Sequence, residues 1–182
     1  MTNIPLQCAC FLQNLVNKYN SLNSEDLPIN EMYQIFDLIS TPAVQFIDFT
    51  IRLNHKIHCS ECNNILAVAL IEKALKLNAG LSLTKFNIHK IYLSALIITC
   101  MLYDDDFRIN KEICYSLGIN CEEVNNLISK FFELIELNSY ISRDDYLRIS
   151  RIVGNDKFYK IHSTNESYFH IKLLYNSWES IL

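Results

Sequence analysis

Four side chains that commonly bind metals fall within eight positions of one another: His55, His58, Cys59 and Cys62. Zinc is bound in proteins by cysteine and histidine, often through a C-x2-C pair like the one that these two cysteines form. A structural zinc site takes four ligands, and no second cysteine pair lies nearby in the sequence. The pair Cys8 and Cys10 could complete a site only if the fold brought it close. We therefore predict that the chain binds no metal.

The seven cysteines could also supply a nucleophile beside a histidine. Five of them lie in, or at the start of, segments predicted to be apolar helices: Cys8, Cys10, Cys100, Cys114 and Cys121. A thiol in apolar surroundings stays protonated and unreactive. The N-terminal residues lack the basic and apolar regions of a signal peptide, so the thiols are expected to be reduced. We predict an intracellular protein of the nucleus or cytoplasm, with no catalytic residues.

The composition argues against three further classes of partner. The formal net charge is −4 and the lysines and arginines are scattered, whereas nucleic-acid binding leaves a basic patch. The three glycines are isolated, and a phosphate-binding loop needs a cluster of them. The uncharged run 91–103 is too short to cross a bilayer, which takes about twenty apolar residues. We predict no nucleic-acid partner, no membrane partner and no cofactor.

The same composition favours an all-α fold with one core. Half of the 182 residues are hydrophobic, and there are only three glycines and three prolines, too few for the turns of an all-β fold. Residues 88–106 form the longest nearly uncharged stretch, which predicts a helix buried on almost every side. Asn87 can cap this helix, and the acidic cluster 104–106 opposes the helix dipole at its other end.

Apolar residues at helical spacing predict further helices around this central one. They cover residues 1–20, 31–39, 42–54, 60–78, 110–118, 120–137, 142–153 and 165–178. For the helix from Pro42 we expect Thr41 as the N-cap, and Val44, Ile47 and Ile51 on the buried face. Gly80 is the expected left-handed stop after the 60–78 helix.

Motifs in the middle of the chain carry a resemblance to a known family. The first of the five helices has a Pro and an Asp-aromatic…Arg pattern, and the second has an acidic–basic pair: Pro42, Asp48, Phe49 and Arg52, then Glu72 and Lys73. The third opens Asn-x-His-basic and closes on two acids: Asn87, His89, Lys90, Asp104 and Asp105. After these come a helix ending in Gly and a Glu-x-Asn-x-Leu helix: Asn110, Gly118, Glu123, Asn125 and Leu127.

In order and spacing these motifs resemble the cyclin box, and are most similar to that of the P/U-type cyclins, relatives of the phosphate-pathway cyclin. The resemblance implies a single five-helix cyclin box at residues 41–138. It leaves an N-terminal helical extension at 1–40 and a C-terminal helical extension at 139–182. Cyclins are not enzymes themselves, and the resemblance implies a heterodimer with a cyclin-dependent protein kinase. The cyclin activates that kinase by positioning its C-helix.

Two charged positions of the family pattern are apolar in this chain. Cyclins usually carry a lysine near the end of the third box helix and a glutamate in the fifth, which together grip the kinase. The aligned residues are Met101 and Ile128. A buried charge that lost its partner would be costly, so the loss of both is self-consistent. The kinase-binding patch that the resemblance implies consists of Arg52, Met101, Leu102, Asp105, Ile128 and Phe131.

Other interpretations of these residues stay open at the sequence level. Met101 and Ile128 could equally be core residues, since apolar stripes on helices usually are. Arg52 could bond to backbone carbonyls or to Asp48 and hold the box together, which we favour. The acidic cluster could be only a solvated helix end, and His89 is expected to cap or pack rather than titrate. A cyclin box that lacks the usual charged pair could also be a scaffold, binding a partner without activating a kinase.

Overall fold

The computed structural model describes residues 3–22, 33–40, 42–105, 107 and 111–154, and the regular structure in these ranges is entirely helical. The elements are α1 (Ile4–Leu22), the 3-10 helix η1 (Gln34–Phe36), α2 (Phe46–Ile57), α3 (Glu61–Leu77), α4 (Ile88–Tyr103), α5 (Lys111–Leu117), α6 (Cys121–Leu134) and α7 (Arg143–Val153). The predicted all-α class is confirmed. The predicted helix at 165–178 and the predicted cap Thr41 lie outside the described residues.

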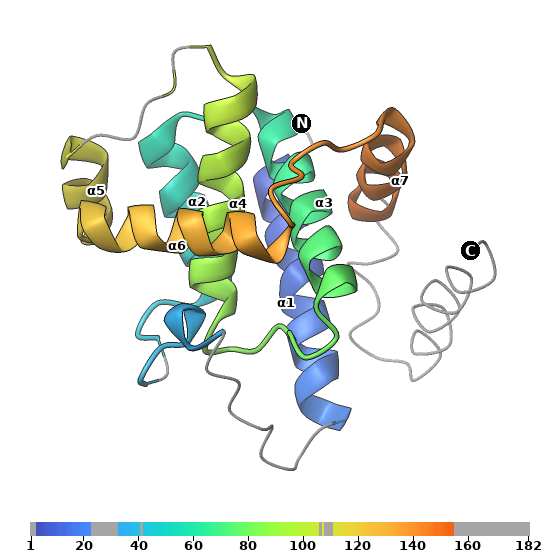
Figure 1. Ribbon diagram of the computed structural model, residues 1–182, viewed down its shortest axis with the longest axis horizontal. Helices are drawn as coiled ribbons and strands as arrows, with labels where there is room; N and C mark the ends of the chain where they lie inside the picture. Colours follow the sequence, from blue (N-terminus) through green and yellow to red (C-terminus); the bar gives the residue numbers. More distant parts are fainter. Residues whose placement is uncertain (1–2, 23–32, 41, 106, 108–110, 155–182) are drawn as a thin grey trace.

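Helix α4 is the centre of the core, as its uncharged sequence predicts. Ile88 and every residue from Ile91 to Cys100 are buried. Such a helix needs neighbours on all sides, and α4 packs against α2, α3 and α6. Figure 1 shows α2 and α3 on opposite sides of α4, with α6 crossing it. None of the described helices is long and apolar enough to cross a membrane.

Several predicted helix ends are confirmed by their capping bonds. Asn120 accepts a hydrogen bond from the backbone N–H of Glu122 at 2.9 Å, which starts α6. Ser142 accepts one from the N–H of Asp145 at 3.1 Å, which starts α7. Gly118 ends α5 with a φ of 69°, a left-handed conformation that glycine adopts without strain.

Helix α2 differs from the prediction in both its ends and its buried face. It begins at Phe46 rather than Pro42 and ends at Ile57 rather than residue 54. Its buried residues are Phe46, Thr50, Leu53 and Ile57, whereas Ile51, expected inside, is 44% exposed. Thr50 can be buried because its hydroxyl donates to the backbone oxygen of Phe46 at 2.9 Å, so the hydroxyl keeps a hydrogen-bond partner.

Two further predictions about helix limits are wrong. In the described part of the helix predicted at 31–39, residues 33–39, only the single turn η1 forms, because the backbone N–H of Leu38 donates to Phe86 O at 2.9 Å instead of continuing a helix. Gly80 is not the left-handed stop of α3. The helix ends at Leu77, and the Asn78 side chain donates to the backbone oxygens of Ala74 and Leu134 at 2.7 and 2.8 Å.

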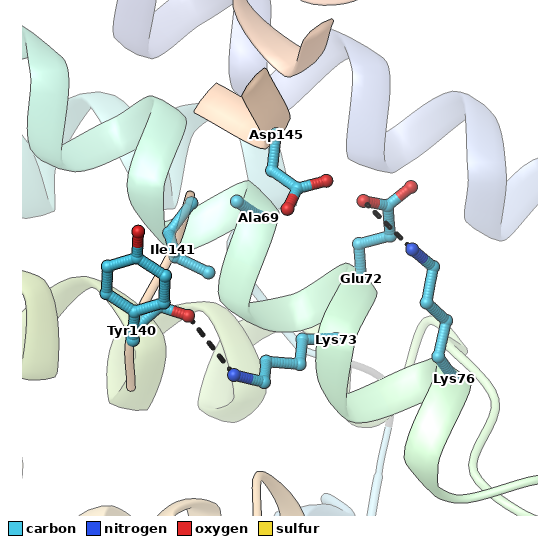
Figure 2. A pocket seen from close by; sticks show the side chains of 7 residues that line it. All are labelled: Ala69, Glu72, Lys73, Lys76, Tyr140, Ile141 and Asp145. Atoms are coloured by element: carbon cyan, nitrogen blue, oxygen red, sulfur yellow. Dashed lines mark hydrogen bonds and ion pairs between the residues drawn. The ribbon is translucent and has the colours of Figure 1, made fainter. Parts of the chain in front are cut away.

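Helix α7 is attached to α3 by an ion pair. Arg148 of α7 binds both carboxylate oxygens of Glu72, at 3.1 and 2.6 Å, and also contacts Asp145 at 3.1 Å. Lys73 donates to the backbone oxygen of Tyr140 at 3.1 Å. Figure 2 shows the small pocket between these segments, with Glu72, Lys73 and Asp145 around it. The acidic–basic pair of the family pattern therefore holds Tyr140 and α7 against α3.

Candidate functional site

Helix α4 leaves the core abruptly at its last turn. Cys100 is fully buried, but Met101, Leu102 and Tyr103 are 48%, 48% and 47% exposed. Three successive residues of an α-helix point about 100° apart, so the turn projects from the core instead of lying flat on it. We call these three residues the α4 end patch. Exposed apolar residues that gather in one place are typical of a surface that binds another protein.

The residue after this turn fixes it to the start of α3. Asp104 is the C-cap of α4, and its backbone N–H donates to Cys100 O at 3.0 Å. One carboxylate oxygen accepts from Asn63 Nδ2 at 2.6 Å and the other from Ser60 Oγ at 3.2 Å. Figure 1 shows the beginning of α3 next to the end of α4. The two acidic residues therefore differ: Asp104 holds the end of α4 against α3, whereas the Asp105 side chain is exposed to solvent.

The division of this acidic pair gives a first testable prediction. Asp104→Ala should lower the free energy of unfolding by about 1–3 kcal/mol, because the buried Asn63 amide loses its acceptor. Asp105→Ala is the matched control and should change it by no more than about 0.5 kcal/mol. Urea denaturation of both variants measures the difference. Equal stabilities would show that the Asp104 contacts do not hold the helix end.

The six predicted contact residues fall into two groups. Arg52, Met101, Leu102 and Asp105 are exposed. Ile128 is only 8% exposed, and Phe131 is fully buried, with its ring edge-on to Phe36 at a centroid distance of 6.4 Å. Met101 is thus a surface residue and Ile128 a core residue. Only the first group can meet a partner without a change in the fold.

Among the described residues, Arg52 makes none of the contacts of the structural role that the sequence favours. Its side chain is exposed on α2, and no hydrogen bond or ion pair joins it to Asp48 or to any other residue in the described part of the chain. Tyr103 was absent from the predicted set, although it is as exposed as Met101. Its position in the sequence could have indicated it, since Tyr103 lies between the two predicted contact residues Leu102 and Asp105.

The Asn-x-His-basic motif at the start of α4 positions the chain that precedes α2. Asn87 stands at the predicted N-cap position of α4, but its side chain makes no capping bond: it accepts from Thr84 N and donates to Ser82 O, both at 2.9 Å. Lys90 donates to Ile35 O at 3.2 Å and pairs with Glu123 Oε1 at 3.1 Å. These contacts tie η1, the loop before α4 and α6 together. The motif therefore supports the fold and lies at the other end of α4 from the end patch.

His89, the third member of this motif, is packed between aromatic rings. Nε2 donates to Val44 O at 3.0 Å, and the ring centroids of Phe46 and Phe49 lie 5.5 and 5.1 Å away. Nδ1 is buried and has no hydrogen-bond partner among the described residues. Burial lowers the pKa of His89, and the bond to Val44 offsets this only in part. His89 therefore packs in its neutral form, as expected from the sequence.

The lowered pKa of His89 predicts how stability depends on pH. The unfolded state binds the proton more readily, with a pKa of about 6.5, so the stabilisation is complete above that pH and is lost below it. His89→Gln keeps a donor for Val44 O but cannot titrate. The wild type should lose more stability than this variant between about pH 7.5 and about pH 5.5 in urea denaturation. Parallel losses in the two proteins would contradict the assignment.

The cluster of histidines and cysteines does not form a metal site among the described residues. No three histidine, cysteine, aspartate or glutamate side chains there lie together as ligands. The rings of His55 and His58 are 6.0 Å apart and both residues are exposed. Cys59 donates to Asn54 Oδ1 at 3.1 Å. The cysteines of the C-x2-C pair thus have separate environments, with Cys62 exposed beside Ser60.

Comparison with known proteins identifies the family. The family model named Cyclin matches residues 12–139, well over half of the chain, from within α1 to just beyond α6. No curated protein matches the chain. The match includes part of the predicted N-terminal extension, so the domain boundaries near 40 and 138 stay a prediction. With an all-helical fold and this match, the chain belongs to the cyclin family, whose members are regulatory proteins and not enzymes.

Proposed function

We propose that the chain is the regulatory subunit of a cyclin-dependent protein kinase, of a type closest to the P/U-type cyclins. It binds the C-helix of the kinase with Met101, Leu102, Tyr103 and Asp105, together with Arg52 on α2. One observation carries the proposal. The turn of α4 where cyclins meet their kinase is the turn at which this central helix leaves the core and presents apolar side chains to solvent.

The proposed mechanism is a shift in the conformations of the kinase. Phosphoryl transfer needs the ion pair between the β3 lysine and the C-helix glutamate of the kinase. A subunit that binds the C-helix more tightly in this arrangement than in the inactive one raises the active population. The α4 end patch suits this role because Asp104 fixes the end of its helix to α3, whereas a flexible surface would adapt to both arrangements.

Apolar contacts can supply the binding free energy that the missing charged pair would contribute. A hydrogen bond to a charged group contributes about 1.5–3 kcal/mol. Full burial of a methionine, leucine or similar side chain contributes about the same, so burying a half-exposed one contributes about 1 kcal/mol. The three residues of the α4 end patch together could therefore match the usual lysine contact. Because the lysine position is also apolar, at Met101, the loss of the glutamate at position 128 leaves no unpaired charge in this chain.

Ile128 and Phe131 take a supporting role in this proposal. Both are buried residues of α6, and α6 packs against α4. Phe131 also contacts Phe36 of η1, so it joins three elements of the core. Their part in kinase binding is to keep α4 in place and not to touch the partner.

The test is purification of the tagged chain from its cells of origin, followed by identification of bound kinases and an activity assay. We expect a cyclin-dependent kinase whose activity rises when the purified chain is added. A kinase that binds without being activated would favour the alternative, an interaction scaffold. Absence of any bound kinase would overturn the proposal.

A further inference from the structure

Two thiols from different elements lie together beside the Asp104 contacts. Cys59 is in the three-residue connection between α2 and α3, and Cys100 is in the last turns of α4. Asn64 Nδ2 lies 3.7 Å from Cys59 Sγ, and Asn63 Nδ2 lies 3.7 Å from Cys100 Sγ. Adjacent residues of α3 thus contact the two sulfur atoms, and a hydrogen bond between the thiols accounts for the opposite shifts of their pKa values.

The two thiols of this pair differ in exposure and acidity. Cys59 is half-buried, and the hydrogen bond from Cys100 is the main cause that lowers its pKa. Cys100 is fully buried, and the same bond and its burial raise its pKa. Burial also raises the pKa of Cys8 to about 12 and that of Cys114 to about 11. Cys59 is therefore the nucleophile of the pair: it is the more exposed thiol, and its lowered pKa favours the thiolate, which is the reactive form.

We propose that Cys59 is a peroxide-sensitive site and that Cys100 resolves it to a disulfide between the α2–α3 connection and α4. The Cys59 thiolate attacks one oxygen of hydrogen peroxide, the O–O bond breaks, and hydroxide leaves to be protonated to water. Cys59 is then a sulfenic acid, oxidised by two electrons. The Cys100 sulfur attacks the Cys59 sulfur, the S–O bond breaks, and the second oxygen leaves as water with the thiol proton.

The first step prepares the second. The charge of the Cys59 thiolate is one of the causes that hold the proton on Cys100. A sulfenic acid is neutral, so this cause disappears when Cys59 is oxidised. Cys100 then loses its proton more easily and faces an electrophilic sulfur. All seven cysteines lie in the described part of the chain, and none of them is in a disulfide there.

The nearby Cys62 is the competing partner for Cys59. It has C-x2-C spacing to Cys59, but it is exposed, and its sulfur lies 3.0 Å from Ser60 Oγ. The causes that shift the pKa of Cys59 include Cys100 but not Cys62. Cys114 and Cys121 form a second thiol pair, between α5 and α6, but its Cys114 has a raised pKa. Both pairs serve as internal comparisons in the test.

The experiment treats the reduced, folded full-length chain with hydrogen peroxide, blocks the remaining thiols, and maps the disulfides by mass spectrometry. We expect a Cys59–Cys100 disulfide that dithiothreitol reverses. Cys100→Ser should leave Cys59 as a sulfenic acid that dimedone labels, and this labelling should be absent in the wild type. Cys62→Ser is the matched control and should form the same disulfide as the wild type.

Three outcomes would overturn the proposal: a Cys59–Cys62 disulfide, oxidation of Cys114 or Cys121 before Cys59, or no change under peroxide. The mapping of the wild type decides between them even if Cys100→Ser fails to fold. The same treatment in urea gives a second check, because a pairing set by the fold should be lost there. Selective Cys59–Cys100 pairing that persists in urea would also count against a structural origin.

Discussion

Met101→Asp is expected to weaken kinase binding by about tenfold or more, equivalent to about 1.4 kcal/mol. The substitution places a carboxylate in the middle of an apolar contact, where it would be desolvated without a partner. Stability should hardly change, because the Met101 side chain is already half exposed. The measurement is the dissociation constant for the kinase that co-purifies with the chain, together with urea denaturation of the variant.

Leu77→Asp provides the matched control for this variant. Leu77 is 44% exposed, close to the 48% of Met101, and it also lies in the last turn of a helix. The start of α3 meets the end of α4, whereas Leu77 lies at the other end of α3, about 21 Å along the helix from Asn63. The Leu77→Asp variant should bind the kinase with the affinity of the wild type. Equal affinity of both variants and the wild type would remove the α4 end patch from the interface.

Phe131→Ala should lower the free energy of unfolding by about 3–5 kcal/mol, a large part of the stability of a domain of this size. The ring is fully buried and packs against Phe36, so its loss leaves a cavity where α6 meets η1. Phe132→Ala is the control, since this neighbouring ring is only partly buried and should cost less. Urea denaturation measures both, and equal costs would contradict the packing described for Phe131.

The burial of the α6 residues decides which variants can test kinase binding. A charge at Ile128, such as Ile128→Arg, would bury an unpaired cation in the core and damage the fold. Loss of kinase binding in such a variant would therefore say nothing about a contact surface. The exposed residues Arg52, Met101 and Asp105 give interpretable variants instead.

Helix positions could be predicted from the sequence where local signals agree. Each of these signals depends only on residues close to it in the sequence: the uncharged run of α4, the caps Asn120 and Ser142, and the helix end at Gly118. The face of α2 could not be predicted in this way. Two stripes with helical spacing compete there, and the buried one contains Thr50, whose polarity argued against it. Only its bond to Phe46 O within the helix makes that burial possible.

The exposure of the candidate contact residues could be predicted from the sequence only in part. Ile128 belongs to the apolar stripe of the amphipathic helix α6, which favours its burial. Met101 lies on the almost uniformly apolar α4, whose sequence does not distinguish exposed positions from buried ones. Figure 1 shows α6 crossing α4, and burial along α4 stops at Cys100, so Met101 lies beyond the buried part of the helix. The separate roles of Asp104 and Asp105 likewise depend on Asn63, which is 41 residues away in sequence.

The contacts of Asp104 also have a consequence for the speed and entropy of association. Ordering the backbone of one residue costs about 1–2 kcal/mol, and a binding segment that folds on contact loses that much affinity for each of its residues. The turn Met101–Tyr103 is already ordered in the free chain, because Asp104 joins its end to Ser60 and Asn63. A partner would meet a surface in its final shape, so the encounter needs no folding step and its rate is set by diffusion and orientation.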